Sequence, residues 1–159
     1  MEHFKVMVLG EGAVGKTSWL HKMRTGEKLD MRYVATLGVE VHPIDFTWFE
    51  ETSDVCLDIW DVAGQDKFAG LRKGYLIQAQ GAIIVYDMMS KTIDEDVAKW
   101  RTICEEFCPN APIIVVGNKN DLVVWGQDEE GDEGLTMSVK EDVGLIEPFK
   151  KMIDLLTSN

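Results

Sequence analysis

The sequence has no apolar run that approaches the ~20 residues a helix needs to span a bilayer. Its first residues, Met1–Lys5, lack the basic and then apolar layout of a signal peptide, and position 2 is not the Gly that myristoylation requires. Its last residues, Leu156–Asn159, include no Cys that could be prenylated. We therefore expect a soluble chain without a membrane anchor.

Cysteine is scarce, with three residues, and none is accompanied by a cluster of His. Cys104 and Cys108 are four residues apart in a segment with helical periodicity, which leaves a metal-binding pair as one alternative. The alternative that we favour is that Cys56, Cys104 and Cys108 are small buried apolar residues in a reducing compartment.

Positive charge is also scarce, because 16 Lys and Arg residues stand against 28 Asp and Glu, for a net charge of −12. This balance argues against nonspecific binding to nucleic acid or to an anionic membrane. Part of the acidity lies in residues 127–133, which we interpret as a solvated loop. The 159 residues, 45% of them apolar, predict one domain over residues 1–159 with a buried core, and we expect a monomer.

Short apolar runs that are typical of buried strands alternate with segments of helical periodicity. Strands are predicted over 4–9, 40–49, 54–60, 82–86, 113–116 and 135–137, and helices over 17–23, within 61–79, over 94–107 and over 146–156. Residues 26–38 are polar and aperiodic and are predicted as a loop, and residues 50–53 as the turn of a hairpin. This order predicts an α/β fold with a mostly parallel six-stranded sheet, one antiparallel edge strand and helices on both faces. Ligands of such sheets bind at the carboxyl ends of the strands.

The loop after the first strand carries a phosphate-binding motif. It reads GEGAVGKT, a full match to GxxxxGK[ST], with a predicted strand before it and a predicted helix after it. Its glycines let backbone N–H groups point at a phosphate, Lys16 would neutralise the β- and γ-phosphates, and Thr17 would coordinate Mg²⁺. The nucleotide-contacting residues predicted here are Gly10, Glu11, Gly12, Ala13, Val14, Gly15, Lys16, Thr17 and Ser18. By itself the motif indicates only a P-loop that binds a nucleoside triphosphate.

The loop after the strand at 54–60 reads DVAGQ. Asp61 can hold Mg²⁺ through a water molecule, the N–H of Gly64 can reach a γ-phosphate, and Gln65 can orient an attacking water. Asp and Gly also form ordinary turns, so this motif depends on the first one for its meaning.

The loop after the strand at 113–116 reads NKND and predicts a preference for guanine. The Asp121 carboxylate can accept both N1–H and N2–H₂ of guanine, which adenine cannot offer. Asn118 would tie this loop to the phosphate loop, and the stem of Lys119 would cover the base. The motif disfavours an ATPase or a nucleoside kinase.

Thr36 lies in the predicted loop between the first helix and the second strand. It could ligate Mg²⁺ only while a γ-phosphate holds that loop closed, which is the physical basis of a nucleotide-dependent switch. A loop Thr alone is usually a turn residue, so this role rests on the other motifs.

Together these four motifs resemble the small GTPases of the Ras superfamily, and residues 33–43 and 64–80 resemble the switch regions of the Ran family. The resemblance implies a P-loop fold that binds GTP or GDP with Mg²⁺, an activating protein, an exchange factor and nuclear-transport receptors. It implies that Lys67 and Phe68 meet the carrier of the GDP-bound form, and that the protein is found in the nucleus and the cytoplasm. It also assigns Ser138, Val139 and Lys140 to a last loop that contacts the base through a backbone N–H.

The chain departs from the Ran pattern in three places. Residues 122–134 are shorter and acidic, so the family's helix between the fifth and sixth strands is expected to be reduced or lost, and the acidic C-terminal extension is missing. Lys28 or Leu29 replaces the aromatic residue expected over the base. Trp100 matches a family surface position, although a helical Trp more often packs in the core. Two hypotheses remain: a cycling switch with slow GTP hydrolysis, on the order of 10⁻⁴ to 10⁻² s⁻¹, or a nucleotide-binding interaction module that engages only some Ran partners.

Overall fold

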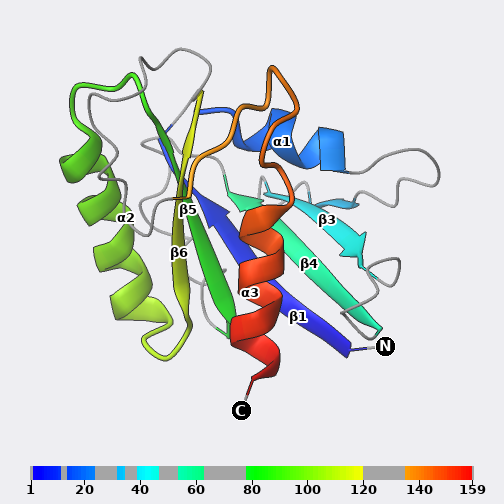
Figure 1. Ribbon diagram of the computed structural model, residues 1–159. Helices are drawn as coiled ribbons and strands as arrows, with labels where there is room; N and C mark the ends of the chain where they lie inside the picture. Colours follow the sequence, from blue (N-terminus) through cyan, green and yellow to red (C-terminus); the bar gives the residue numbers. More distant parts are fainter. Residues whose placement is uncertain are drawn as a thin grey trace.

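Strand β1 lies inside a six-stranded sheet with the order β2-β3-β4-β1-β5-β6 (Figure 1). The computed structural model describes residues 2–11, 14–23, 32–34, 39–46, 54–62, 78–119 and 135–158. The strands are β1 Glu2–Leu9, β2 Arg32–Val34, β3 Val39–Asp45, β4 Val55–Val62, β5 Gly81–Asp87 and β6 Ile113–Asn118. The helices in the described part are α1 Lys16–Met23, α2 Ile93–Phe107 and α3 Glu147–Thr157.

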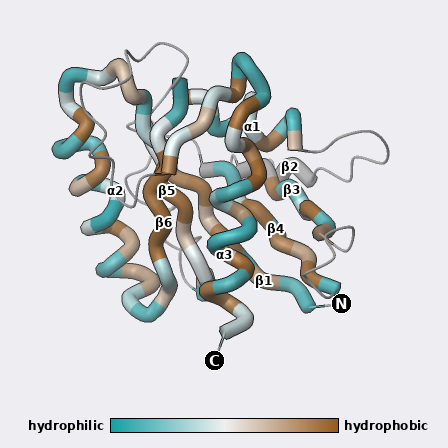
Figure 2. Tube along the Cα trace, viewed as in Figure 1, coloured by the Kyte–Doolittle hydropathy of each residue, from teal (hydrophilic) through white to brown (hydrophobic). Residues whose placement is uncertain are grey.

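The apolar residues of β1 divide between the two faces of the sheet. Val6 and Val8 belong to one hydrophobic cluster, whereas Met7 and Leu9 belong to another, and all four are fully buried. Successive side chains of a strand point to opposite faces, so a strand covered on both sides must be apolar at every position. Figure 2 shows apolar colours along much of the central strands.

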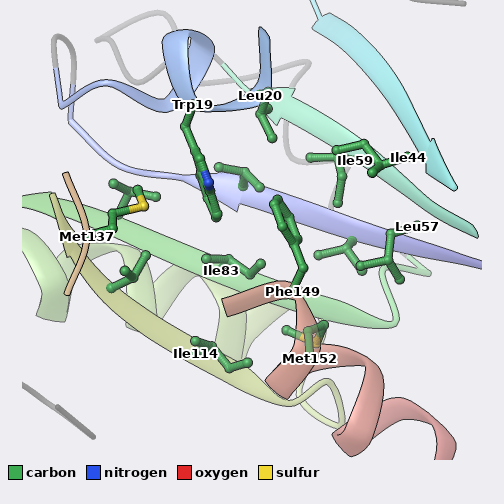
Figure 3. Close-up of a cluster of buried hydrophobic side chains, with 14 of the residues drawn as sticks. Trp19, Leu20, Ile44, Leu57, Ile59, Ile83, Ile114, Met137, Phe149 and Met152 are labelled. Atoms are coloured by element: carbon green, nitrogen blue, oxygen red, sulfur yellow. The ribbon is translucent and has the colours of Figure 1, made fainter. Parts of the chain in front are cut away.

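Helices α1 and α3 cover one face of the sheet, where the first cluster lies (Figure 3). The Trp19 ring of α1 stacks on the Phe149 ring of α3, with centroids 4.5 Å apart, and the indole N–H donates to the Leu145 carbonyl over 2.9 Å. Phe46 lies tilted against Phe149 at 5.7 Å. These contacts fix the position of α1, whose first residues belong to the phosphate-binding motif.

Helix α2 covers the other face through Trp100 and Cys104. The residues Cys56, Cys104 and Cys108 are all free and buried, which confirms the burial predicted for them. None of the described helices combines the length and the apolar character required to cross a membrane.

The main sequence predictions of strands and helices are confirmed, including the antiparallel pairing of β3 with β4. The prediction of a loop over residues 26–38 was wrong for 32–34, because these residues form β2, which pairs antiparallel with β3. Consequently the antiparallel strand, β3, is not at the edge of the sheet as predicted. A strand of three residues is too short to show periodicity, and its pairing depends on a neighbour supplied by the tertiary structure.

The strand predicted over 135–137 was also wrong in part, because Thr136 makes only an isolated parallel bridge with Gly117. The Met137 N–H still donates to the Gly117 carbonyl over 2.7 Å, so this segment lies against β6. The helix predicted within 61–79 and the reduced segment 122–134 lie outside the described residues, except for the ends 61–62 and 78–79.

Candidate nucleotide-binding site

The predicted site residues that the structure describes gather at the carboxyl ends of the parallel strands. Gly10 follows the last residue of β1, Asp61 lies near the end of β4, and Asn118 is the last residue of β6. The strands β4, β1, β5 and β6 are mutually parallel, so their carboxyl ends lie at the same end of the sheet. This is the part of an open α/β sheet where ligands bind.

Two glycines allow the phosphate loop to lie against the strand ends. A Cβ on Gly10 would come within 2.3 Å of the Val85 carbonyl oxygen, and one on Gly15 within 2.3 Å of Asn118 Nδ2. Gly15 also has a φ of +98°, which favours glycine over residues that carry a side chain. The glycines of the motif therefore serve close packing as well as access to a phosphate.

Lys16, the first residue of α1 directly after this loop, is only 7% exposed. Its Nζ donates to the Gly10 carbonyl oxygen over 3.3 Å. Burial lowers the pKa of Lys16 below its ordinary value, and the nearby carboxylates of Asp61 and Glu11 oppose that change. The loop thus holds a buried positive charge, an arrangement that an anionic ligand would stabilise.

Thr17 and Asp61 meet in the same region. The Thr17 hydroxyl donates to Asp61 Oδ2 over 2.7 Å, and Asp61 is 6% exposed. Hydroxyl and carboxylate oxygens are the hard ligands that Mg²⁺ prefers. These two residues therefore fit the Mg²⁺ that the motif implies.

Asn118 joins three segments. Its Nδ2 donates to the Val14 carbonyl over 2.9 Å, and its Oδ1 accepts from the Val139 N–H over 3.1 Å. The side chain is buried at 3% exposure, so both bonds are shielded from water. The link from this loop to the phosphate loop, which the sequence predicts, is present. The N–H of Val139, a candidate for the base contact, is engaged within the protein instead.

The turn around Ser138 is held by its own backbone and by α1. Ser138 and Val143 exchange two backbone hydrogen bonds, and the Glu141 N–H donates to Ser138 Oγ over 3.0 Å. Lys22 donates to the Val139 carbonyl and to Asp142 Oδ1, the latter over 2.8 Å. Lys140 is exposed. Sequence reasoning missed Lys22, and no motif points to it.

Sequence reasoning also missed Asp87, the last residue of β5. Its Oδ2 lies 2.8 Å from Lys119 Nζ, and its Oδ1 accepts from the Met89 N–H over 2.8 Å. Lys119 has a φ of +75°, an uncommon backbone conformation for a residue with a side chain. One signal in the sequence could have revealed Asp87. It lies at the carboxyl end of an apolar strand, where ligands of parallel sheets bind.

Glu11 connects the phosphate loop to α2. Its Oε2 accepts from Trp100 Nε1 over 2.6 Å and from Lys99 Nζ over 3.0 Å. Trp100 is 1% exposed, so its position in the core, one of the two alternatives left by the sequence, is confirmed.

Several predicted site residues lie outside the described residues, and their predicted roles stay predictions. They are Gly12, Ala13, Thr36, Gly64, Gln65 and Asp121, together with Lys28, Leu29, Lys67 and Phe68.

A comparison with protein families agrees with this geometry. Residues 5–121, well over half of the chain, match the family described as Roc, the Ras of Complex domain of DAPkinase. The matched range begins in β1 and ends with Asp121, so it includes the three loops that carry the phosphate, Asp-Gly and guanine motifs. The chain therefore belongs to the Roc family of Ras-like GTPase domains.

Proposed function

We propose that this protein is a guanine-nucleotide switch that binds GTP or GDP with Mg²⁺ and hydrolyses GTP slowly. The proposal rests on one observation. Lys16, the Thr17–Asp61 pair and the Asn118 link all lie at the carboxyl ends of the parallel strands. Membership in a Ras-like GTPase family supports the same conclusion.

In this proposal the buried ammonium of Lys16 exchanges its contact with the Gly10 carbonyl for the β- and γ-phosphates. Thr17 and Asp61 would hold Mg²⁺, which neutralises phosphate charge when it is bound. The backbone N–H groups of the loop and the start of α1 supply further positive potential.

For the base, Asp121 accepts the two guanine N–H groups in this proposal. Asn118 supports it, because its two hydrogen bonds hold the start of the loop that carries Asp121. In this proposal the stem of Lys119, whose ammonium pairs with Asp87, covers the base. Adenine would leave the charged Asp121 carboxylate without its hydrogen-bond donors, which costs more free energy than leaving a neutral acceptor without them.

For hydrolysis, Gln65 orients the attacking water, and Lys16 and the loop N–H groups stabilise the charge on the transferred phosphoryl group. Gly64 and Thr36 detect the γ-phosphate and give the switch its two states. The slow rate of this class, on the order of 10⁻⁴ to 10⁻² s⁻¹ without assistance, implies an activating protein.

A second and more specific candidate function is that of a Ran-type switch in transport between nucleus and cytoplasm. The sequence segments 33–43 and 64–80 favour it, and the resemblance of these segments to the Ran family assigns Lys67 and Phe68 to contact with a carrier of the GDP form. The acidic 122–134 segment argues for the narrower alternative, a nucleotide-binding module that engages only some Ran partners.

The first test is the nucleotide content and turnover of the purified protein. We would denature it, identify the released base by chromatography, and then follow phosphate release with GTP and Mg²⁺ for the wild type and Gln65→Leu. Guanine nucleotide with slow turnover that the variant loses would support the switch. Guanine nucleotide without turnover, even with an activating protein, would favour the module. Absence of any guanine-nucleotide binding would overturn the proposal.

Transport partners are tested separately by affinity capture on the protein loaded with GDP or with a GTP analogue. Capture of nuclear-transport proteins that depends on the bound nucleotide would support the Ran-type switch. Capture that is the same in both states would support the module, and no capture would reject both Ran-related candidates while leaving the general switch intact.

A further inference from the structure

Three side chains with different metal-binding atoms meet at the start of β1 and β4, on the face of the sheet that α2 covers farther along. They are His3, Cys56 and Asp58, and their ligand atoms all lie within 4.8 Å of one another. His3 Nδ1 lies 3.1 Å from Asp58 Oδ2, and Cys56 Sγ lies 3.7 Å from Asp58 Oδ1. From this geometry we infer a second cation site, separate from the nucleotide site, that binds a divalent transition metal of the Zn²⁺ class.

The arrangement follows from the register of two strands. His3 is the cross-strand partner of Cys56 in the parallel pair β1–β4, and Asp58 is two residues farther along β4. Residues two apart on a strand point to the same face, so all three side chains are delivered to one place by regular backbone. Sites built on strands hold their ligands more accurately than sites on loops.

The spacing and the donor atoms fit the metal class. Ligands at 2.0–2.3 Å from a tetrahedral Zn²⁺ are about 3.3–3.8 Å from one another. The 3.1 Å from His3 Nδ1 and the 3.7 Å from Cys56 Sγ to the two oxygens of the Asp58 carboxylate are close to this range. An imidazole nitrogen, a thiolate and a carboxylate together favour Zn²⁺ over Mg²⁺ or Ca²⁺, which prefer oxygen alone. Three protein ligands leave one position for water.

The exposure of the three side chains is consistent with a metal site that is open to solvent. Cys56 is 4% exposed, whereas the side chains of His3 and Asp58 are 54% and 26% exposed. Solvent can therefore deliver the metal and supply the fourth ligand. Binding releases the thiol proton of Cys56, and the proton of His3 if the imidazole is charged, to solvent, because the metal binds the deprotonated forms.

Lys5, the cross-strand partner of Asp58, carries a positive charge on the same face of the sheet. Its Nζ lies 4.3 Å from the centroid of the Trp60 ring, and burial lowers the pKa of this Lys. The site is also distant from the phosphate loop, because seven residues of β1 at ~3.3 Å each separate His3 from Gly10 by about 23 Å. Occupancy of one site can thus be measured without occupying the other.

The probe is Co²⁺, titrated into the protein without a histidine tag and with excess Mg²⁺ to occupy sites made of oxygen ligands. We expect one Co²⁺ per chain with a thiolate-to-cobalt charge-transfer band, and displacement of that band by Zn²⁺. Cys56→Ser should lose the band, and the matched control Cys108→Ser should keep it. Circular dichroism of each variant shows that it is folded.

His3→Gln changes an exposed residue, so this variant can still test the metal site if Cys56→Ser does not fold. It should weaken Co²⁺ binding by at least ~10-fold, the loss seen even for residues that only support metal ligands. Asp58→Asn should do the same. A wild type without the band, a band that persists in Cys56→Ser, or an unchanged affinity in His3→Gln would each overturn the inference, leaving His3 and Asp58 as a surface ion pair.

Discussion

At the scale of single residues, Asn118 makes the link to the phosphate loop that the sequence predicts and a second link to the turn at Val139. It joins the phosphate loop at Val14 to the turn at Val139, so it holds together two segments that are more than 100 positions apart. Lys119 and Asp87 add an ion pair beside it. The end of β6 is therefore joined directly to the phosphate loop and to the turn at Val139.

We predict that Asn118→Ala destabilises the protein as well as weakening nucleotide binding. The substitution leaves the Val14 carbonyl and the Val139 N–H without their partner, at about 1–3 kcal/mol for each buried group left unsatisfied. Urea unfolding followed by circular dichroism measures this loss. Asn110→Ala, at an exposed position, is the control and should leave the midpoint within error. Equal midpoints for Asn118→Ala and the wild type would contradict the link.

Lys16 makes stability depend on pH when no nucleotide is bound. Burial lowers its pKa below the ordinary 10.5, so the unfolded chain holds this proton more tightly than the folded chain. Below the lowered pKa, Lys16 is protonated in both the folded and the unfolded chain, and burial of its charge destabilises the folded chain by the full amount. Between the lowered pKa and 10.5 the unfolded state binds more protons, so the free energy of unfolding rises with pH.

The comparison that isolates this effect is nucleotide-free wild type against Lys16→Met, with urea unfolding at a series of pH values. The free energy of unfolding of the wild type, relative to the variant, should increase as the pH rises toward 10.5. A difference that does not change with pH would show that burial of Lys16 has no effect on its proton affinity.

At the scale of secondary structure, α1 is positioned by its contact with α3. The stacked rings of Trp19 and Phe149, and the hydrogen bond from Trp19 to Leu145, hold the helix that begins at Lys16. Packing between two elements far apart in the sequence thereby sets the position of the phosphate-binding residues.

We predict that Trp19→Ala costs about 3–5 kcal/mol, the usual loss for a large buried ring. This is a large part of the ~5–15 kcal/mol that stabilises a typical domain. In a double-mutant cycle of Trp19→Leu with Phe149→Leu, the coupling should be about 0.5–1.5 kcal/mol from the ring pair. Leu155→Ala on α3, where Leu155 is 43% exposed, should stay within about 0.5 kcal/mol of wild type. A coupling of zero would mean that α1 and α3 are held independently.

At the scale of the whole molecule, a ligand that binds only the folded chain must raise its thermal stability. At 100 times the dissociation constant the gain is about 2.7 kcal/mol, which for a chain of this size corresponds to roughly 5–11 °C in Tm. We predict this shift for GDP with Mg²⁺ and none for ADP at the same concentration. Differential scanning calorimetry measures both. Equal shifts would remove the predicted selectivity for guanine.

Much of the fold could be predicted because the signals were local. The buried strands β1, β5 and β6 are nearly continuous apolar runs, and α2 and α3 have clear helical periodicity. The predicted bounds of these elements therefore agree with the observed bounds to within one or two residues. The phosphate, Asp-Gly and guanine motifs follow strands, and parallel strands place such loops at one edge. The sequence by itself therefore determined the fold class and the location of the candidate site.

The tertiary structure decided what depends on contacts between distant segments. Strand β2 has only three residues, and its pairing depends on β3, so no periodic pattern could reveal it. The hydrogen bonds of Lys22 with the turn at Val139 and the pairing of Asp87 with Lys119 cross wide gaps in the sequence. The register of β1 against β4, which brings His3 to Cys56, is likewise a property of the pairing of strands. Local residue patterns report propensity and burial, but the partner of each side chain is chosen by the packing of the whole chain.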